Sequence, residues 1–509
     1  MAKALEEPRS PKGLVEPVLL GLAVLVFSLL THHHWQQVCD DAFIAFRYAD
    51  HVAQGWGPVW NRGEAVEGFS SPLWLGILVV GKAVRADLRT WSGVLGVIFS
   101  GLCLVFVHRC AFALAQRRPP AAAACLACAL IYPLYYWAPA GLETTLFATL
   151  VTAAAWSLVA CSNRLWALVA ALLGVVRPEG PFLMLGLLGL ARLAHGRAAI
   201  RIATVSLAVT PALGWLAFRL SFYGEWLPNT YYAKATGVLL HRLQSGFAYA
   251  GWALLALAVT GAALWLARIA DRKSLAVAAF LALVLVPVVG SGGDWMWHGR
   301  MLLPALPALA ALAVTAVARA PAGRRPVQVL ALVMAGAPFL PSPALVADAL
   351  LGKRMPETSY QEGTMVAAAF TAARAIAANY SPDALVAVNH AGALPYRLPN
   401  PVLDMTGLCN HHIAHQVAGG VHQKFDPAYV LARKPRLVVL NSRVRPSEEG
   451  GWYHPGYWAG ETALALQPEF QRLYRPVKTY WEWRWVAGVT SYILLFERVA
   501  PATDIGGVY

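Results

Sequence analysis

LVEPVLLGLAVLVFSLLTHHHWQQVCDDAFIAFRYAD, residues 14–50, joins a long apolar run to a segment that carries two adjacent acids and an arginine. The apolar part has the length of a membrane helix, which needs about 20 such residues to cross the hydrocarbon core. No small-residue cleavage site follows it. We therefore interpret the run as a retained membrane anchor rather than a removed signal peptide.

The rest of the chain has the composition of a membrane protein. Of its 509 residues, 58% are hydrophobic and only 13% are charged, whereas an ordinary soluble domain has about 25% charged residues. This composition excludes a disordered chain and argues against a soluble enzyme. The run 72–84 is too short to cross and is predicted to be an interfacial helix. Membrane-length windows predict eleven spans, at residues 14–31, 90–108, 119–137, 143–161, 164–177, 180–195, 200–221, 246–267, 274–291, 301–319 and 326–344.

The distribution of charge predicts how these spans are oriented. A net charge of +14 is compatible with nucleic-acid binding, but basic residues of membrane proteins concentrate in cytoplasmic loops. If the N-terminus is cytoplasmic, the inner loops hold arginines such as Arg109, Arg117, Arg192 and Arg319. We therefore expect a lipid bilayer as partner and no nucleic acid. The odd number of spans places the C-terminal part outside, where most acids of the membrane half also fall.

Two parts are predicted from these patterns. Residues 1–344 form a polytopic α-helical membrane domain, with a first outer loop at 32–89 that contains interfacial helices. Residues 345–509, called the tail below, form a soluble α/β domain because strand-like and helix-like runs alternate there. The tail has an amphipathic helix pattern at 363–379 and strand patterns at 384–389, 401–405, 436–441 and 490–499.

The first outer loop carries the pair Asp40 and Asp41. Neighbours on a helix point about 100° apart, so one carboxylate can face a cavity while the other caps the helix N-terminus. Arg47 follows two turns later and can share a face with an acid. A capping pair on an interfacial helix is an equally open interpretation of these residues.

Other predicted outer span ends also combine acids with cations among tryptophans and tyrosines. For each loop alone, a solvated hairpin with interfacial aromatic residues is the favoured explanation, but several such loops on one face favour a polar site. Arginine and lysine suit a phosphate, aromatic rings suit a sugar, and a carboxylate suits a general base. The residues concerned are Glu143, Arg177, Glu179, Glu225, Asn229, Tyr232, Lys234, Asp294, His298 and Arg300.

Histidines and cysteines give two weaker patterns. His411, His412 and His415, near Asp404, have the i, i+4 spacing of metal ligands, but the flanking sequence is typical of a loop and we expect no metal. Cys39 and Cys409 are the two cysteines predicted on the oxidising side; a disulfide between them is conceivable, and free thiols are the favoured alternative.

The segment DDAFIAFRYADHVAQGWGPVWNRGEAVEGFSSPLW (40–74) resembles the first outer loop of GT-C-type polyprenyl-phosphate glycosyltransferases. The match is strongest to the arabinofuranosyltransferases of the mycobacterial cell wall. RPEG (177–180), YGEWLPNTYYAK (223–234), GGDW (292–295) with Arg300, and HAGALPYRLPNPVLDMTGL (390–408) resemble the same branch in the same order.

The resemblance implies an inverting glycosyltransferase in the bacterial cytoplasmic membrane, with its site on the outer face and no cofactor or metal. Its donor would be a sugar on a polyprenyl monophosphate, with arabinofuranose favoured, and its acceptor a cell-envelope glycan. Asp40 is favoured as the base with Asp41 as its helper, and Arg300, Lys234 and Arg177 would bind the donor phosphate. Substrate binding would fall to Arg47, Glu143, Glu179, Glu225, Asn229, Tyr232, Asp294 and His298.

Three alternatives remain open at this point. One is a GT-C enzyme with another sugar, or with a protein or lipid acceptor. Another is a transporter or flippase of lipid-linked sugars, although such carriers usually contain paired repeats and bind near the bilayer midplane. The third is a structural scaffold within a cell-wall complex.

Overall fold

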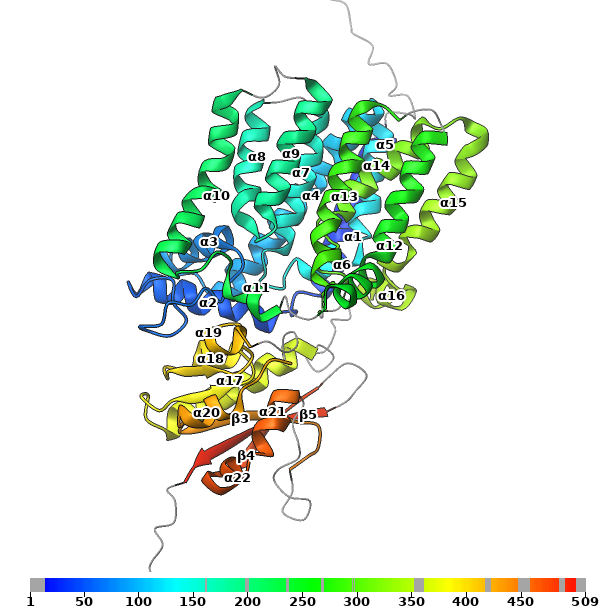
Figure 1. The fold of residues 1–509 in the computed structure, drawn as a ribbon. Helices are drawn as coiled ribbons and strands as arrows, with labels where there is room; N and C mark the ends of the chain where they lie inside the picture. Colours follow the sequence, from blue (N-terminus) through cyan, green and yellow to red (C-terminus); the bar gives the residue numbers. More distant parts are fainter. Residues whose placement is uncertain are drawn as a thin grey trace, which may run out of the picture.

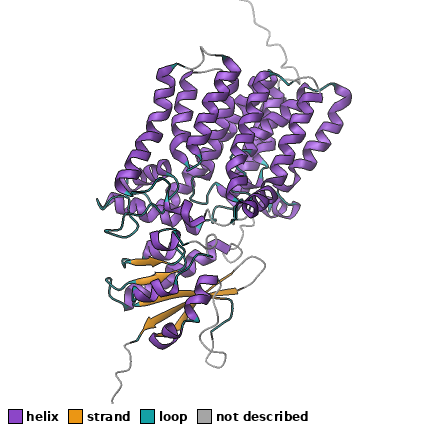
Figure 2. Ribbon diagram, viewed as in Figure 1, coloured by secondary structure: helices purple, strands orange, loops and turns teal. Residues whose placement is uncertain are grey.

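The computed structural model describes residues 14–499, apart from 161–162, 197–200, 235–237, 267–269, 295, 297, 352–360, 417–422, 447–457 and 485–489. Trp295 and Trp297 of the predicted GGDWMWHGR loop, and Cys161, thus lie outside the described residues. Helices dominate the first two thirds of the chain, and a sheet appears only in the tail (Figure 2).

A helix forms at every predicted span. Five of the described helices are long and apolar enough to cross a membrane: α1 (Val15–His33), α4 (Leu88–Ala115), α10 (Ile202–Phe222), α12 (Leu239–Leu266) and α13 (Arg272–Ser291). The other helices at predicted spans are shorter: α5 (Arg118–Ala129), α6 (Tyr132–Trp137), α7 (Thr144–Ala160), α8 (Asn163–Val176), α9 (Gly180–His195), α14 (Leu306–Arg319) and α15 (Arg325–Gly336).

Two predicted spans are interrupted where proline occurs. The run 119–137 divides into α5 and α6 because Pro133, in the first turn of α6, cannot continue the preceding helix. The last run, 326–344, stops at Gly336 and continues as the short helix η4 (Ala337–Phe339), which contains Pro338. Apolar content alone therefore overestimated the length of these helices.

Helices α2 (Asp40–Ala53) and α3 (Pro72–Ala83) lie at the end of the helix bundle that faces the tail (Figure 1). Helix α3 is the predicted interfacial helix. Its N-terminus is capped by Ser71, whose hydroxyl accepts a hydrogen bond from Trp74 N at 3.2 Å. Trp74 in turn is buried and donates to Gly141 O at 3.1 Å, which fixes α3 to the loop before α7.

The tail contains a five-stranded sheet in the order β2–β1–β3–β5–β4. Strands β1, β2 and β3 are parallel, whereas β5 is antiparallel to both β3 and β4. The predicted strands and the predicted helix form, as β1 (Val386–Val388), β2 (Val402–Asp404), β3 (Leu437–Ser442), β5 (Thr490–Arg498) and α17 (Gln361–Asn379). The remaining helices from α11 on are α11 (Asn229–Lys234), α16 (Pro343–Leu350), α18 (Ala393–Arg397), α19 (His411–Ala414), α20 (Pro427–Ala432), α21 (Ala459–Ala465) and α22 (Pro468–Leu473).

Strand β4 (Tyr474–Arg484) is the strand of the described sheet that the sequence pattern did not predict. It is an edge strand, it contains Pro476, and its pairing with β5 shifts register between Pro476 and Tyr480. Most of its side chains are at least partly exposed. An edge strand with proline and little burial lacks the apolar run by which buried strands are found.

The two faces of the sheet belong to different cores. Successive residues of a strand point to opposite faces, and in β3 Val438 packs in a small core confined to the tail, whereas Val439 belongs to the main core shared with the membrane helices. Helix α17 contacts β4, α18 and α2. The layer of α17 and α18 therefore joins the sheet to the helix bundle.

Gly68 marks one tight contact between the 32–89 loop and the tail. A Cβ at this position would lie 2.4 Å from Cys409 Sγ and 2.8 Å from Tyr48 Oη. The Gly68 N–H also donates to Tyr48 Oη at 2.8 Å. A side chain here has to displace a buried cysteine or break that hydrogen bond.

Gly68→Ala is expected to lower the free energy of unfolding by about 1–3 kcal/mol, the usual cost of overpacking. The matched control is Gly76→Ala in α3, where a Cβ meets no atom within 4 Å. Thermal unfolding of both purified variants in detergent measures the difference. Equal melting temperatures would contradict the tight packing of the tail on this loop.

Candidate functional site at the junction of helix bundle and tail

Asp40 lies at the N-terminus of α2, where the helix bundle meets the tail. Cys39 is the extended N-cap residue, and its N–H donates to Ala140 O at 3.0 Å. Asp40 Oδ1 accepts a hydrogen bond from Ala393 N, in the first turn of α18, at 2.8 Å. The N-terminus of α2 thus lies between the loop before α7 and the tail segment at Ala393, and the Asp40 carboxylate is buried where these segments meet.

Burial of the Asp40 side chain raises its pKa to about 7, and the neighbouring Asp41 charge adds to this rise, although the backbone N–H of Ala393 opposes it. A carboxylate with this pKa can accept a proton near neutral pH. It is held in place by the backbone N–H groups of Ala393 and Gly392 in the tail. These are the properties of a positioned general base.

Asp41 faces a cluster of arginines and acids. Arg300, after α13, forms an ion pair with Asp294, with nitrogen–oxygen distances of 2.7 and 3.3 Å. Burial lowers the pKa of Arg300, but the charges of Asp294 and Asp41 outweigh it and raise the pKa above its ordinary value. Arg300 and Asp294 therefore stay charged although their side chains are buried.

Arg177 forms the second pair of this cluster. It donates to Glu179 at 2.7 Å and also binds Glu143, at the start of α7. Burial lowers the Arg177 pKa, the two glutamates raise it more strongly, and the positive charge of Arg300 acts against them. The structure thus brings together five predicted site residues: Arg177, Glu143, Glu179, Asp294 and Arg300.

Two further cations lie beside this cluster. Lys234, at the end of α11, is exposed, forms no ion pair among the described residues, and lowers the pKa of Asp294 after Arg300. Arg242, near the start of α12, packs against Gly292 and has a buried Nε without a hydrogen-bond partner among the described residues. Arg242 was not among the predicted site residues, since it stands in the apolar helix α12 and outside the loops that resemble those of the glycosyltransferases.

Arg47 and Asn229, predicted to bind substrate, instead bind tail backbone. Arg47 is buried and donates to Trp60 O at 2.8 Å, to Pro395 O, and to Leu398 O at 3.2 Å. Asn229 donates to Gly407 O at 2.8 Å and to Leu408 O at 2.9 Å. Both side chains therefore fix the tail against the helix bundle.

Two buried residues that strengthen this junction were not among the predicted site residues. Asn61 pairs with β2 like a neighbouring strand, since it donates to Val402 O at 2.7 Å and accepts from Val402 N at 3.2 Å. Glu67 is 2% exposed and pairs with Arg219 of α10. Their partners lie in distant parts of the chain.

His298 stands in a turn with φ of +61°. Its ring centroid lies 4.4 Å from that of Tyr136 and 4.7 Å from that of Tyr132. His298 is exposed as a residue, but the packing of its ring on the two tyrosines removes water from it and lowers its pKa to about 4, so the imidazole is neutral at neutral pH. The imidazole ring therefore provides an aromatic surface near Arg300 and adds no positive charge there.

Glu225 and Tyr232 lie together at another part of the junction, near α19. Glu225 accepts from His411 at 2.8 Å, and the Tyr232 ring centroid lies 4.5 Å from that of His415. Asp404, expected near these histidines, is instead buried and accepts from Thr406 N at 2.8 Å and Cys409 N at 2.7 Å.

The cysteine alternatives are resolved in favour of free thiols. Cys39 and Cys409 are both buried, and no disulfide joins them. The conceivable disulfide between them is therefore wrong. The tail is attached through hydrogen bonds and packing at these residues, since Cys409 Sγ faces Gly68.

Comparisons with known proteins agree with this architecture. A family model described as a domain of unknown function, DUF8728, matches residues 355–495. The terminal beta-(1->2)-arabinofuranosyltransferase of Mycobacterium tuberculosis is 29% identical over 334 residues, which are 53% of this chain and 51% of that protein. The chain therefore spans about half the length of the curated relative it matches.

Among solved structures, ArnT from Cupriavidus metallidurans bound to undecaprenyl phosphate is similar with a TM-score of 0.56 and 14% identity, over 96% of this chain and 98% of ArnT. Its apo state gives a TM-score of 0.54 with 15% identity, over 94% and 97% of the two chains. The predicted resemblance to GT-C glycosyltransferases is thus confirmed, by sequence similarity to an arabinofuranosyltransferase and by the fold of ArnT.

Proposed function

We propose that this protein is an integral-membrane inverting glycosyltransferase that moves a sugar from a polyprenyl monophosphate to an acceptor hydroxyl. The observation that carries the proposal is the acid pair at the N-terminus of α2: Asp40 is buried and has a raised pKa, and the charge of its neighbour Asp41 acts on Arg300 of the cationic cluster. The similarity to an arabinofuranosyltransferase supports the reaction class. The ArnT structure was solved with undecaprenyl phosphate, which supports a polyprenyl-phosphate donor.

The reaction follows from the charges. The acceptor hydroxyl attacks the anomeric carbon from the face opposite the phosphate, the bond between that carbon and the phosphate oxygen breaks, and polyprenyl phosphate leaves. The hydroxyl proton goes to Asp40. Negative charge grows on the leaving oxygen, so fixed cations beside it lower the barrier. Attack and departure on opposite faces invert the configuration at the anomeric carbon.

Lys234 is the first contact we assign to the donor phosphate, because it is exposed and unpaired among the described residues. Arg300 and Arg177 are held by Asp294, Glu143 and Glu179, which fix the direction of both guanidinium groups. Arg242 supplies a fourth cation, with its Nε still able to donate. Asp294, Glu143 and Glu179 therefore act on the phosphate indirectly, by orienting Arg300 and Arg177.

The remaining assignments extend the sequence predictions. Arabinofuranose is the favoured sugar and a cell-envelope glycan the favoured acceptor, with His298 and Tyr232 as aromatic contacts. Arg47 and Asn229 position the tail. Residues 1–344 form the membrane domain with eleven crossings, and residues 345–509 the extracytoplasmic domain, in a bacterial cytoplasmic membrane with a cytoplasmic N-terminus. Five described helices that are long and apolar enough to cross a membrane, with shorter helices at the other predicted spans, support a multi-pass topology.

Asp40→Asn is expected to lower kcat by about 100-fold or more, because the amide cannot accept the acceptor proton. The variant retains an oxygen for Ala393 N–H, and it removes an acid whose ionisation is disfavoured by burial, so its melting temperature at neutral pH should not fall. Turnover is measured with a polyprenyl-phosphate sugar and a glycan acceptor. Asp383→Asn, at an exposed tail position, is the control.

Full turnover by Asp40→Asn would overturn the assignment of the base. Loss of turnover in Asp41→Asn alone would exchange the roles of the two acids. Donor binding or movement across vesicles by the wild type, with no transfer product, would support the transporter alternative instead.

The wild-type rate is expected to rise between about pH 6 and about pH 8, since the base works only when deprotonated and burial raises the pKa of Asp40 to about 7. Asp41→Asn removes a charge that contributes to this rise, so the midpoint should move to lower pH. A pH–rate profile of kcat/KM for both proteins measures the shift. Identical midpoints would contradict the coupling of the two carboxylates.

Lys234→Met is expected to raise the KM for the donor by about tenfold, because a charge-assisted phosphate contact contributes about 1.5–3 kcal/mol. The control is Lys273→Met, in the first turn of α13, at the end of that helix remote from the Asp294 loop. Initial rates over a range of donor concentrations provide the comparison. Equal effects of both substitutions would remove Lys234 from the donor site.

A further inference from the structure

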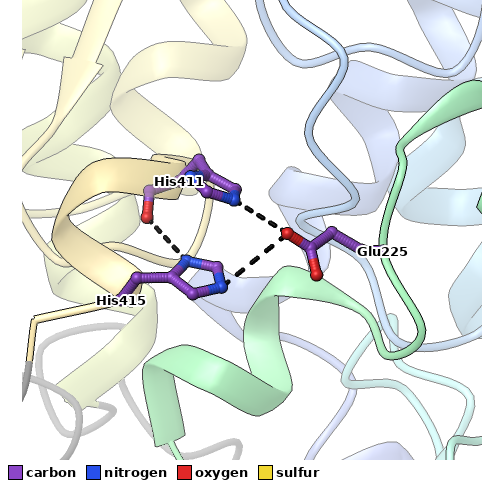
Figure 3. Close-up of side chains that lie close together, drawn as sticks. All are labelled: Glu225, His411 and His415. Carbon is purple, nitrogen blue, oxygen red and sulfur yellow. Dashed lines mark hydrogen bonds and ion pairs between the residues drawn. The ribbon is translucent and has the colours of Figure 1, made fainter.

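We propose that Glu225, His411 and His415 form a zinc site that fastens the α10–α11 loop to the tail. One ligand atom from each of these three side chains lies within 4.8 Å of the others. Figure 3 shows the two imidazole rings directed at the same carboxylate oxygen. The zinc site does not require the proposed glycosyl transfer, since none of the three residues binds Asp40 or the Arg300 pair; Tyr232, the proposed sugar contact, is its neighbour through Glu225 and His415.

The His415 ring is oriented as a zinc-bound histidine would be. Its Nδ1 lies 2.9 Å from His411 O, so Nδ1 carries the proton and donates it to that carbonyl. The lone pair is then on Nε2, which points at Glu225 Oε1 from 3.8 Å. A hydrogen bond from the second ring nitrogen to a backbone carbonyl is the usual way in which proteins orient a metal-binding histidine.

His411 supplies the second nitrogen. Its Nε2 lies 2.8 Å from Glu225 Oε1, and the two histidine rings stack with their centroids 4.0 Å apart. The i, i+4 spacing puts both rings on one face of the short helix α19. Binding of the cation replaces the proton between His411 and Glu225, and that proton passes to solvent.

The surroundings hold these ligands in place independently of the cation. Burial and a hydrogen bond from the Tyr232 hydroxyl to the Glu225 carboxylate raise the pKa of Tyr232. Lys424 Nζ donates to Tyr232 O at 2.7 Å and also binds Ala414 O. The Lys424 side chain therefore bridges the backbone of α11, which follows the Glu225 loop, and the backbone of α19.

The ligand set selects the type of cation. Two imidazole nitrogens and one carboxylate oxygen suit zinc, with bonds of about 2.0–2.2 Å, and they leave the fourth tetrahedral position to water. The side chains of Glu225 and His411 are 25% and 56% exposed, so zinc can reach the site from solvent. The bound ion would link two segments that are 186 residues apart in sequence.

The test uses full-length protein without a histidine tag, purified in detergent and freed of metal with a chelator. Competition with a chromophoric chelator measures the zinc affinity and stoichiometry. We expect one tight site per chain, and affinity lower by about tenfold or more in His415→Ala and in Glu225→Gln. Cobalt in place of zinc should give the visible absorption of a tetrahedral site, and zinc should raise the melting temperature of the wild type but not of His415→Ala or Glu225→Gln.

His412→Ala is the matched control on the same helix. His412 is directed at Asp426, with Nε2 2.8 Å from Oδ2, and should bind zinc as the wild type does. Circular dichroism checks that each variant is folded. Absence of stoichiometric binding, or equal affinity in wild type, His415→Ala and Glu225→Gln, would overturn the site. An equal loss in His412→Ala would show nonspecific binding and overturn it as well.

Discussion

Buried hydrogen bonds from side chains of the 32–89 loop to the tail backbone hold the molecule together. Asp40 receives the N–H of Ala393, Arg47 donates to Leu398 O, and Asn61 pairs with Val402. Short strands and a short helix leave such backbone groups without regular partners, and an unpaired buried polar group costs about 1–3 kcal/mol. The loop supplies these partners, and in return the tail encloses Asp40. The burial that raises the pKa of the carboxylate is therefore a consequence of how the tail is attached.

The helical architecture could be predicted from the sequence because each span is a local property. A membrane-length apolar run forms a helix wherever it stands. Its limits were misjudged where Pro133 and Pro338 interrupt it, and also where α4 and α12 extend beyond the predicted spans 90–108 and 246–267. Buried strands such as β3 can be predicted from the sequence for the same reason, since every side chain from Leu437 to Ser442 is buried. Strand β4 has no such signal, because its pairing with β5 depends on a partner and not on its own pattern.

The site was predictable by residue type more than by geometry. Arg177, Glu179, Asp294 and Arg300 were found because opposite charges recur beside predicted span ends, and they do form ion pairs. The partners of Arg47 and Asn229 could not be inferred, since the tail carbonyls that they bind are distant in the chain. For the same reason the histidines of α19 were considered with Asp404, which is near in sequence, while the carboxylate beside them is Glu225. Local spacing indicates which side chains share a face and gives no information on what packs against it.

The two faces of the tail sheet pack into different hydrophobic cores, and this arrangement has an evolutionary consequence. Val438 and Val439 are neighbours in β3, but Val438 packs in the core confined to the tail, whereas Val439 packs in the core that continues into the membrane helices. A tail exchanged by recombination with a diverged homologue would keep the core that is confined to the tail. Its α17 and α18 surface, however, would not be complementary to α2. The solvent-facing residues of the helices that cover the Val438 face can vary independently. Helices α17, α18 and α2 contact one another, so their contact residues have to change together. Diversification of such proteins should thus be fast on one side of the sheet and coordinated on the other.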